Sequence, residues 1–347
     1  QKCNAGYYEN MKQTENYYKK KGGKRMAEVQ SALNSRETVV KRHKPTLLKE
    51  LQKNKVLYLM LLPGLLVLLV NNYLPMFGII IAFKDYNYAK GFWKSDWIWF
   101  ENFKYLFNSR AAFQITRNTL LYNLAFIFVA ATVAVVLAII FNELLNRRLS
   151  KFYQSVMFLP YFLSWVVISY LVFALLSSDM GFVNKLLINM GKEPVNWYVD
   201  PTFWPLIIIA VNTWKWTGYD SIIYLASIIG FDKSLYEAAA VDGASRFQQI
   251  TKVMVPMLAP VVTILTLIKV GRIFFTDFGL FFNIPRNSGP LFDVTNVIET
   301  YVFRALRQTG DIGMASAAGF YQAIVCFIVV LTANYIVRKI DKDSSLF

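Results

Sequence analysis

Residues 118–143 read NTLLYNLAFIFVAATVAVVLAIIFNE, and the final Glu143 is their only charged side chain. Each residue of a helix adds about 1.5 Å, so about 20 apolar residues cross a hydrocarbon core of about 30 Å. This segment therefore predicts a membrane-spanning helix. Five further apolar runs of similar length predict five more spans, at residues 56–82, 156–177, 203–229, 255–280 and 312–337.

The composition of the whole chain agrees with this interpretation. Its 347 residues are 55% hydrophobic and 16% aromatic, whereas only 17% are charged. Soluble domains contain about 25% charged residues. We therefore predict an all-α polytopic membrane protein with six transmembrane helices.

The distribution of Lys and Arg predicts the orientation of these helices. Residues 1–55 form a polar arm with 14 of the 37 basic residues, the six-span domain occupies residues 56–337, and residues 338–347 form a short tail. Six spans place both termini on one side. That side has 23 basic residues in its arm, loops and tail, against 11 in the opposite loops. Because basic loops stay in the cytoplasm, both termini are predicted to be cytoplasmic.

The same arm explains much of the formal net charge of +15. A basic segment beside a span is typical of contact with anionic membrane lipids. Nucleic acid is not an expected partner, because no fold that reads bases accompanies the arm. The single histidine, His43, lies in the arm, and the two cysteines, Cys3 and Cys326, have no zinc-site spacing. The sequence thus predicts no metal site, no histidine-based catalysis and no enzyme activity.

One loop, residues 233–256 between the fourth and fifth spans, contains an unusual pattern. Its central part reads LYEAAAVDGASRFQQITKVMVP from Leu235 to Pro256. Strong helix formers predict a short helix over 237–241, followed by a turn in which Gly243 takes a positive φ and Asp242 caps the next helix. That second helix, 244–254, would present one apolar stripe, which consists of Phe247, Ile250 and Met254. The pattern alone favours a helix on the lipid surface over one that docks on a protein.

The loop resembles the EAA motif of binding-protein-dependent ABC importer permeases. The matching positions are Glu237, Ala238, Ala239, Gly243, Ile250 and Pro256. The resemblance implies that this loop is a pair of coupling helices that dock on a cytoplasmic ATPase, with Asp242 and Phe247 in the docking segment. It also implies the type I ABC importer permease fold.

Several other phrases resemble the LplB-type polysaccharide permease branch of this family. They include FENF at 100–103, DFGLF at 277–281, DVTNVIETYV at 293–302 and GDIGM at 310–314. The resemblance implies a multi-pass protein of the bacterial plasma membrane that passes oligosaccharides to the cytoplasm. The implied partners are a second, homologous permease, two ATPase subunits and an extracellular sugar-binding lipoprotein.

The sequence agrees independently that an ATPase must be a separate chain. A GxxxxGK[ST] phosphate-binding loop occurs nowhere in the chain, although such a loop holds the phosphates in P-loop ATPases. No cofactor is therefore expected in this chain, and ATP and Mg²⁺ are expected in the partner ATPase.

Charged and aromatic side chains inside the predicted spans are candidates for the substrate path. In the fifth span, Lys269, Arg272 and Asp277 would share one helix face about 140° wide. The fourth span adds a second group, which consists of Trp214, Lys215, Trp216, Tyr219 and Asp220. These residues could form ion pairs or interfacial anchors that fix the packing, or they could line a polar path. The two extra cations, Lys269 and Arg272, suggest an acidic, uronate-containing sugar.

Two other features leave alternatives open. The loop 84–117 is rich in aromatic residues, which suit an interface belt better than a sugar-stacking surface. An ion-coupled secondary transporter is the main rival function, although the sequence shows no matched pair of broken spans. A membrane enzyme would need a clustered acid, base or metal set, for which candidates are few.

Overall fold

The computed structural model describes residues 54–108, 110–179 and 181–340. The predicted basic arm, with His43 and Cys3, and most of the predicted tail therefore lie outside the described residues. The chain forms two compact units, residues 1–74 and 75–347. In the first unit, α4 (Lys55–Leu68) continues into a π-helical turn, Leu69–Tyr73, and neither segment buries a residue. A helix that is apolar on all sides needs an apolar surrounding, as a membrane span does.

The second unit is built on four long helices, α8 (Arg110–Glu143), α12 (Trp204–Ile229), α15 (Val255–Val270) and α19 (Ile312–Ile340). Its shorter helices are α5 (Leu74–Met76, which begins in the first unit), α6 (Gly91–Lys94), α7 (Glu101–Asn108), α9 (Arg147–Phe158), α10 (Trp165–Leu176), α11 (Phe182–Asn189), α13 (Lys233–Val241), α14 (Arg246–Gln249), α16 (Phe278–Asn283), α17 (Phe292–Thr295) and α18 (Ile298–Arg304). Strands β1 (Lys84–Asp85) and β2 (Asp96–Trp97) pair antiparallel. The 3-10 segments are Phe77–Phe83, Leu159–Phe162 and Gly289–Leu291, and the further π segments are Ile250–Met254 and Ala305–Thr309.

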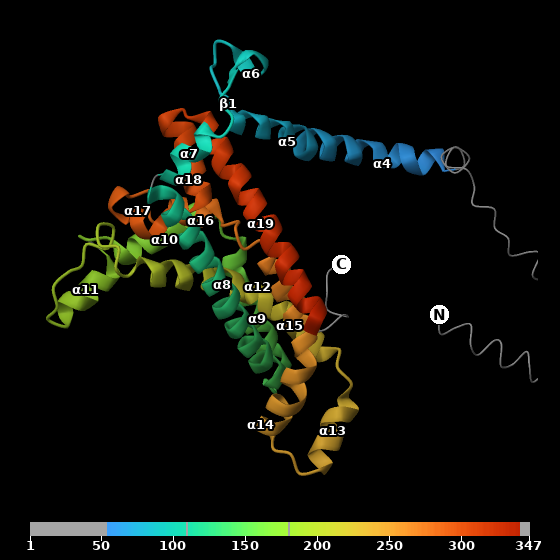
Figure 1. The fold of residues 1–347 in the computed structure, drawn as a ribbon. Coiled ribbons are helices and arrows are strands. Elements are labelled where there is room, and N and C mark those ends of the chain that lie inside the picture. Colours follow the sequence, from blue (N-terminus) through green and yellow to red (C-terminus); the bar gives the residue numbers. More distant parts are fainter. Residues whose placement is uncertain (1–53, 109, 180, 341–347) are drawn as a thin grey trace, which may run out of the picture. The chain divides into compact units, whose positions relative to one another are not determined.

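Small residues allow α8 and α12 to pack closely. Ala134 and Ala138 of α8 are fully buried in a cluster with Tyr224, Leu225 and Ile228 of α12. Small side chains at helix interfaces are typical of membrane proteins, where close backbone approach replaces the hydrophobic driving force. In Figure 1, α13 and α14 lie at one end of this bundle, and α17 and α18 lie near the other end.

The apolar helices confirm a helical membrane protein, but the structure does not confirm six spans. By length and composition, four stretches of the described chain qualify as spans: Lys55–Phe83, Arg110–Glu143, Arg246–Val270 and Ile312–Tyr335. A fifth exists if the pair Arg147–Phe162 and Trp165–Leu176 is one span, although its halves meet at 102°. Helix α12, which contains Lys215 and Asp220, is not among them.

Two of the predicted spans are not continuous helices. The third is broken between Phe162 and Trp165, and the sequence did not predict this break. The fifth ends at Val270 instead of residue 280, and a turn at 271–274 follows. The angles that placed Lys269, Arg272 and Asp277 on one helix face were therefore wrong, because α15 ends before the last two.

Side chains of neighbouring helices satisfy the irregular backbone after α15. Backbone outside a helix must find other hydrogen-bond partners at membrane depth. Three amide side chains donate hydrogen bonds to backbone carbonyls of this region. Asn118 donates to Asn296 O at 2.9 Å, Asn123 donates to Ile273 O at 2.8 Å, and Gln322 donates to Phe274 O. Glu299 accepts from the backbone N–H of Thr276 at 2.8 Å. Helices α8, α18 and α19 thus hold this segment in place.

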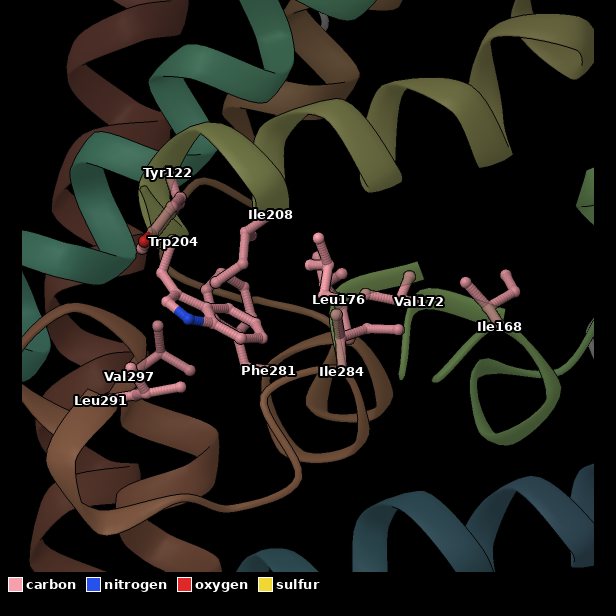
Figure 2. Packing of buried hydrophobic residues seen from close by; sticks show 11 residues of the cluster. Tyr122, Ile168, Val172, Leu176, Trp204, Ile208, Phe281, Ile284, Leu291 and Val297 are labelled. Atoms are coloured by element: carbon pink, nitrogen blue, oxygen red, sulfur yellow. The ribbon is translucent and has the colours of Figure 1, made fainter. Parts of the chain in front are cut away.

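The core beside this segment is centred on Trp204. Figure 2 shows its ring among Tyr122, Phe281 and Val297. All four residues belong to one buried cluster, which unites α8, α12, α16 and the segment before α18. This cluster fixes the start of α12 against the irregular backbone.

The aromatic-rich loop 84–117 begins with a small hairpin, in which β1 pairs with β2. Lys84 of β1 is buried, and its ammonium group donates to the carbonyls of Phe92 and Trp93 at 3.0 and 3.2 Å. Several aromatic side chains of this loop, such as Tyr88, Trp93 and Trp99, are exposed. Their assignment to an interface belt stays a prediction.

Candidate functional site

The coupling loop begins with a capped helix. Asp232 accepts a hydrogen bond from the backbone N–H of Ser234 at 2.9 Å, and this bond holds the pKa of Asp232 below its usual value. With this N-cap, α13 starts at Lys233, one turn before the predicted start at Glu237. Glu237 and Ala238 are exposed, and Ala239 is half-buried.

Gly243 ends α13 in a Schellman motif. Its backbone N–H donates to Ala240 O at 3.0 Å, and the next N–H, of Ala244, donates to Ala239 O at 2.9 Å. This motif requires a left-handed residue, and Gly243 has the predicted positive φ, +81°. A Cβ at this position would meet no atom within 4 Å, so the backbone conformation alone requires glycine.

The cap of the second helix differs from the prediction. Ser245, not Asp242, is the N-cap of α14, and it forms a capping box with Gln248. Asp242 is an exposed residue at the end of α13. A serine followed three residues later by glutamine is the sequence signature of such a box, so the correct cap could have been found from the sequence.

The predicted apolar stripe does not form. Helix α14 passes into the π segment Ile250–Met254 and then into α15, in whose first turn Pro256 lies. Met254 is only 2% exposed and packs into the α8–α12 core, whereas Phe247 is 75% exposed. Ile250 is half-buried. The π segment changes the spacing of side chains, so the three residues do not share one face.

The tip of the loop nevertheless presents apolar side chains to the outside. Val241 is 88% exposed and Phe247 is 75% exposed, on either side of Gly243. Figure 1 shows α13 and α14 as a pair at this end of the bundle. We call Glu237, Ala238, Val241 and Phe247 the coupling surface, after the docking role that the sequence predicts for this loop. The sequence interpretation did not select Val241, although an apolar residue that closes an alanine-rich helix is a usable signal.

A cavity of about 740 Å³ separates the coupling loop from the ends of the long helices. It is lined by the end of α8, the start of α9, the end of α12, and α13 and α14. Tyr236 lies in its wall, where burial raises the pKa of the phenol and the Glu143 carboxylate raises it further.

In the predicted substrate path, Lys215 has a structural role. It is buried, and its ammonium group donates to the carbonyls of Pro160 at 3.3 Å, Tyr161 at 3.0 Å and Leu163. It also lies 5.1 Å from the ring of Trp165. These carbonyls lie at the break before α10, so Lys215 stabilises the broken third span from α12.

Lys269 and Asp220 form an ion pair between α15 and α12. Lys269 Nζ lies 2.5 Å from Asp220 Oδ2, and the two side chains are 33% and 11% exposed. Arg272 lies in the turn after α15 and is exposed. Within the described part of the chain, no ion pair or side-chain hydrogen bond of Arg272 is found.

Asp277 connects the break before α10 with the segment after α15. It caps α16 by accepting from the backbone N–H of Gly279 at 2.9 Å, and it accepts from the indole N–H of Trp165 at 2.6 Å. Trp165 packs so closely on Gly279 that a Cβ there would lie 2.3 Å from the ring. Sequence reasoning missed Trp165, since its partner is far away in the chain.

Aromatic rings gather beside the break. Tyr161 stacks on Tyr219 with ring centroids 4.8 Å apart and meets Trp216 edge-on at 5.4 Å. Trp214 is exposed and has no ring contact with these residues among the described pairs. Helix α12 reaches the break because Gly218 lies against the backbone of Met157, whose oxygen would be 1.9 Å from a Cβ.

Comparison with known proteins places the chain in a family. Residues 130–342 match the family described as binding-protein-dependent transport system inner membrane component. Two relatives come from Bacillus subtilis (strain 168). The polygalacturonan/rhamnogalacturonan transport system permease protein YteP is 35% identical over 310 residues, which cover 87% of this chain and 94% of YteP. Protein LplB is 31% identical over 293 residues, which cover 84% of this chain and 92% of LplB.

A solved structure is similar to this chain, and the similarity covers nearly the whole of the solved chain. It belongs to a bacterial ABC transporter involved in the import of the acidic polysaccharide alginate. The two chains superpose with a TM-score of 0.78 at 33% identity, covering 85% of this chain and 99% of that chain. This chain thus belongs to the family of binding-protein-dependent transport system inner membrane components, and it is a membrane-embedded permease subunit of an ABC transporter and not an enzyme.

Proposed function

We propose that the chain is the permease subunit of an ATP-driven importer for oligosaccharides that contain uronic acids. The substrate class is supported by the names of two similar proteins, since polygalacturonan and alginate are both polymers of uronic acids. The chain takes a sugar delivered by an extracellular binding lipoprotein and passes it to the cytoplasm together with a second, homologous permease.

The coupling surface is the observation that carries this proposal. Val241 and Phe247 are exposed apolar residues held on a rigid Schellman turn. Exposed apolar groups on a rigid support suit a protein partner better than water. The partner is a pair of ATPase subunits, which hold ATP and Mg²⁺, and Glu237 and Ala238 complete the contact.

The topology follows from this arrangement. In the proposal, α12 is the span that brings the number of crossings to six, although its composition is partly polar. Its charges have partners, because Lys215 binds three carbonyls and Asp220 pairs with Lys269. Satisfied charges of this kind are tolerated at membrane depth. Both termini and the coupling surface then lie in the cytoplasm.

Recognition of an acidic sugar is assigned to Arg272 and not to Lys269. The ammonium group of Lys269 is occupied by Asp220 at 2.5 Å, whereas the guanidinium of Arg272 is exposed. An unpaired guanidinium binds carboxylates with two parallel hydrogen bonds. The rings of Tyr161, Trp216 and Tyr219 supply faces on which sugar rings pack.

Co-purification with the ATPase tests the coupling surface. We expect Val241→Asp and Phe247→Asp to reduce the amount of ATPase bound to the solubilised permease at least tenfold. Val199→Asp is the matched control, because Val199 is also exposed but lies in the connection before α12. Equal ATPase recovery with Val241→Asp and Val199→Asp would reject the docking role.

Uptake by the reconstituted complex tests the substrate. We expect Arg272→Gln to lower the uptake of uronate oligosaccharides about tenfold and to leave any uptake of neutral oligosaccharides unchanged. Lys269→Gln should affect both classes alike, since it breaks an internal ion pair. If Arg272→Gln transports uronates as well as the unmodified complex does, the assignment of Arg272 is wrong.

A further inference from the structure

The cavity behind the coupling loop shares Glu237 with the coupling surface, but neither ATPase docking nor the sugar path uses its basic residues. Its basic lining residues are Arg147, Lys151, Lys233 and Arg246, and its acidic ones are Glu143 and Glu237. Four cations against two carboxylates leave an excess of positive charge. In the described part of the chain, none of these six side chains forms an ion pair. The cations are therefore available to an anion.

A second observation in the same place concerns the hydroxyl group of Tyr236. The hydroxyl of Tyr236 is buried, yet it has no hydrogen-bond partner among the described residues. Tyr236 lines this cavity. An unsatisfied buried hydroxyl is unfavourable, so a ligand with acceptor oxygens would stabilise the site.

The cavity is also open to an apolar surface. Leu145 and Ile229 line it and are 99% and 66% exposed. Helix α8 presents exposed Val133, Val136 and Ile140 at spacings of three and four residues. Side chains at such spacing share one helix face, and this face leads along α8 toward the cavity. A ligand with a charged head and apolar tails matches both parts.

We propose that this cavity binds the phosphodiester headgroup of an anionic phospholipid, whose acyl chains lie along α8. The cations form charge-assisted hydrogen bonds with the phosphate oxygens, and the Tyr236 hydroxyl donates to one of them. Basic pockets between helices at the cytoplasmic surface are suited to such headgroups. The proposal rests on the proposed function only in placing this end of the bundle at the cytoplasmic surface.

The bound lipid would link the coupling loop to the ends of the long helices. Arg147 and Lys151 belong to α9, whereas Lys233 and Arg246 flank the coupling surface on α13 and α14. A single headgroup bound by both sets connects the loop to the bundle. Its loss should loosen the loop without altering the coupling surface itself.

Thermal unfolding in lipid nanodiscs tests the proposal on the full chain. We expect the unmodified protein to unfold at a temperature several degrees higher in phosphatidylglycerol than in phosphatidylcholine. The double variant Arg147→Ala with Lys151→Ala should lose most of this difference. The matched control is Arg148→Ala with Lys252→Ala, which removes the same charge from exposed residues outside the cavity lining, and it should keep the difference.

Two further arms identify the ligand and guard against misfolding. Inorganic phosphate added to nanodiscs of phosphatidylcholine should not raise the unfolding temperature; if it reproduces the full effect, the ligand is free phosphate and the lipid assignment is wrong. If the double variant does not accumulate, Lys233→Ala replaces it. Equal lipid dependence in the cavity and control variants overturns the proposal. None of these measurements needs transport or ATPase, so their outcome is independent of the test of function.

Discussion

Trp165 donates its indole N–H to the carboxylate of Asp277 at 2.6 Å, across a separation of 112 residues in the chain. The contact joins the first turn of α10, which follows the break at Leu163, to the N-cap of α16, which follows the turn that ends α15. Because Lys215 lies 5.1 Å from the same indole ring, α12 takes part in the same junction. A movement at one break should therefore also displace the residues at the other.

Trp165→Phe should destabilise this junction while it keeps the aromatic ring. The change removes the donor and leaves Asp277 with its bond to Gly279. Loss of a hydrogen bond to a charged group costs about 1.5–3 kcal/mol, which should lower the thermal unfolding temperature of the solubilised protein by several degrees. Trp214→Phe, at an exposed tryptophan of α12, is the control. Similar unfolding temperatures for the two variants would show that the Trp165–Asp277 bond contributes little.

Lys215→Met should be strongly destabilising, because it removes the donor to the carbonyls of Tyr161 and Leu163 at the helix break. The carbonyl of Pro160 keeps its bond from the backbone N–H of Leu163. Each unsatisfied buried group costs about 1–3 kcal/mol, so the total loss is several kcal/mol. Reduced yield and an earlier unfolding transition are the expected readouts. Lys185→Met changes an exposed lysine of α11 and should be neutral. A Lys215→Met protein as stable as Lys185→Met would contradict the role assigned to Lys215.

Gly218→Ala should disrupt the contact between α12 and the break. The added Cβ would lie 1.9 Å from the backbone oxygen of Met157, so the helices must separate, at a cost of about 1–3 kcal/mol or more. The control is Gly319→Ala in α19, where a Cβ meets no atom within 4 Å and where alanine favours the helix by about 1 kcal/mol. The two variants should therefore shift the unfolding temperature in opposite directions, and shifts in the same direction would refute the close approach.

Gly243→Ala should weaken ATPase binding more than it weakens the fold. The substitution forces a left-handed conformation on a residue with a Cβ, at a cost of about 1–2 kcal/mol. Gly191→Ala imposes the same strain, since Gly191 has a φ of +74° and equally open space, but it lies in the connection after α11. The two variants should unfold at similar temperatures, and only Gly243→Ala should lose ATPase in co-purification. Equal ATPase binding by both would mean that the turn at Gly243 does not position the coupling surface.

The local pattern of the sequence predicted some of the features that depend on neighbouring residues. The turn at Gly243 closes within six residues, and it was predicted. The caps Asp232 and Ser245 also act on the next two or three backbone groups, but they were not predicted. The helix pair around Gly243 was therefore predictable, whereas the position of its cap was predicted wrongly from Asp242. The π segment at 250–254, whose last residue Met254 is buried in the α8–α12 core, was not predicted.

The sequence by itself determined that this chain is a helical membrane protein, and it predicted a helical pair around Gly243. Hydropathy and capping are properties of short segments, so they can be assessed without knowledge of the fold. Only the tertiary structure decided what the charges inside the bundle do. Lys215 binds carbonyls more than 50 residues away, and Lys269 finds Asp220 on another helix. Such partners depend on how the breaks at Leu163 and Gly271 bend the chain, and no count along one helix could reveal them.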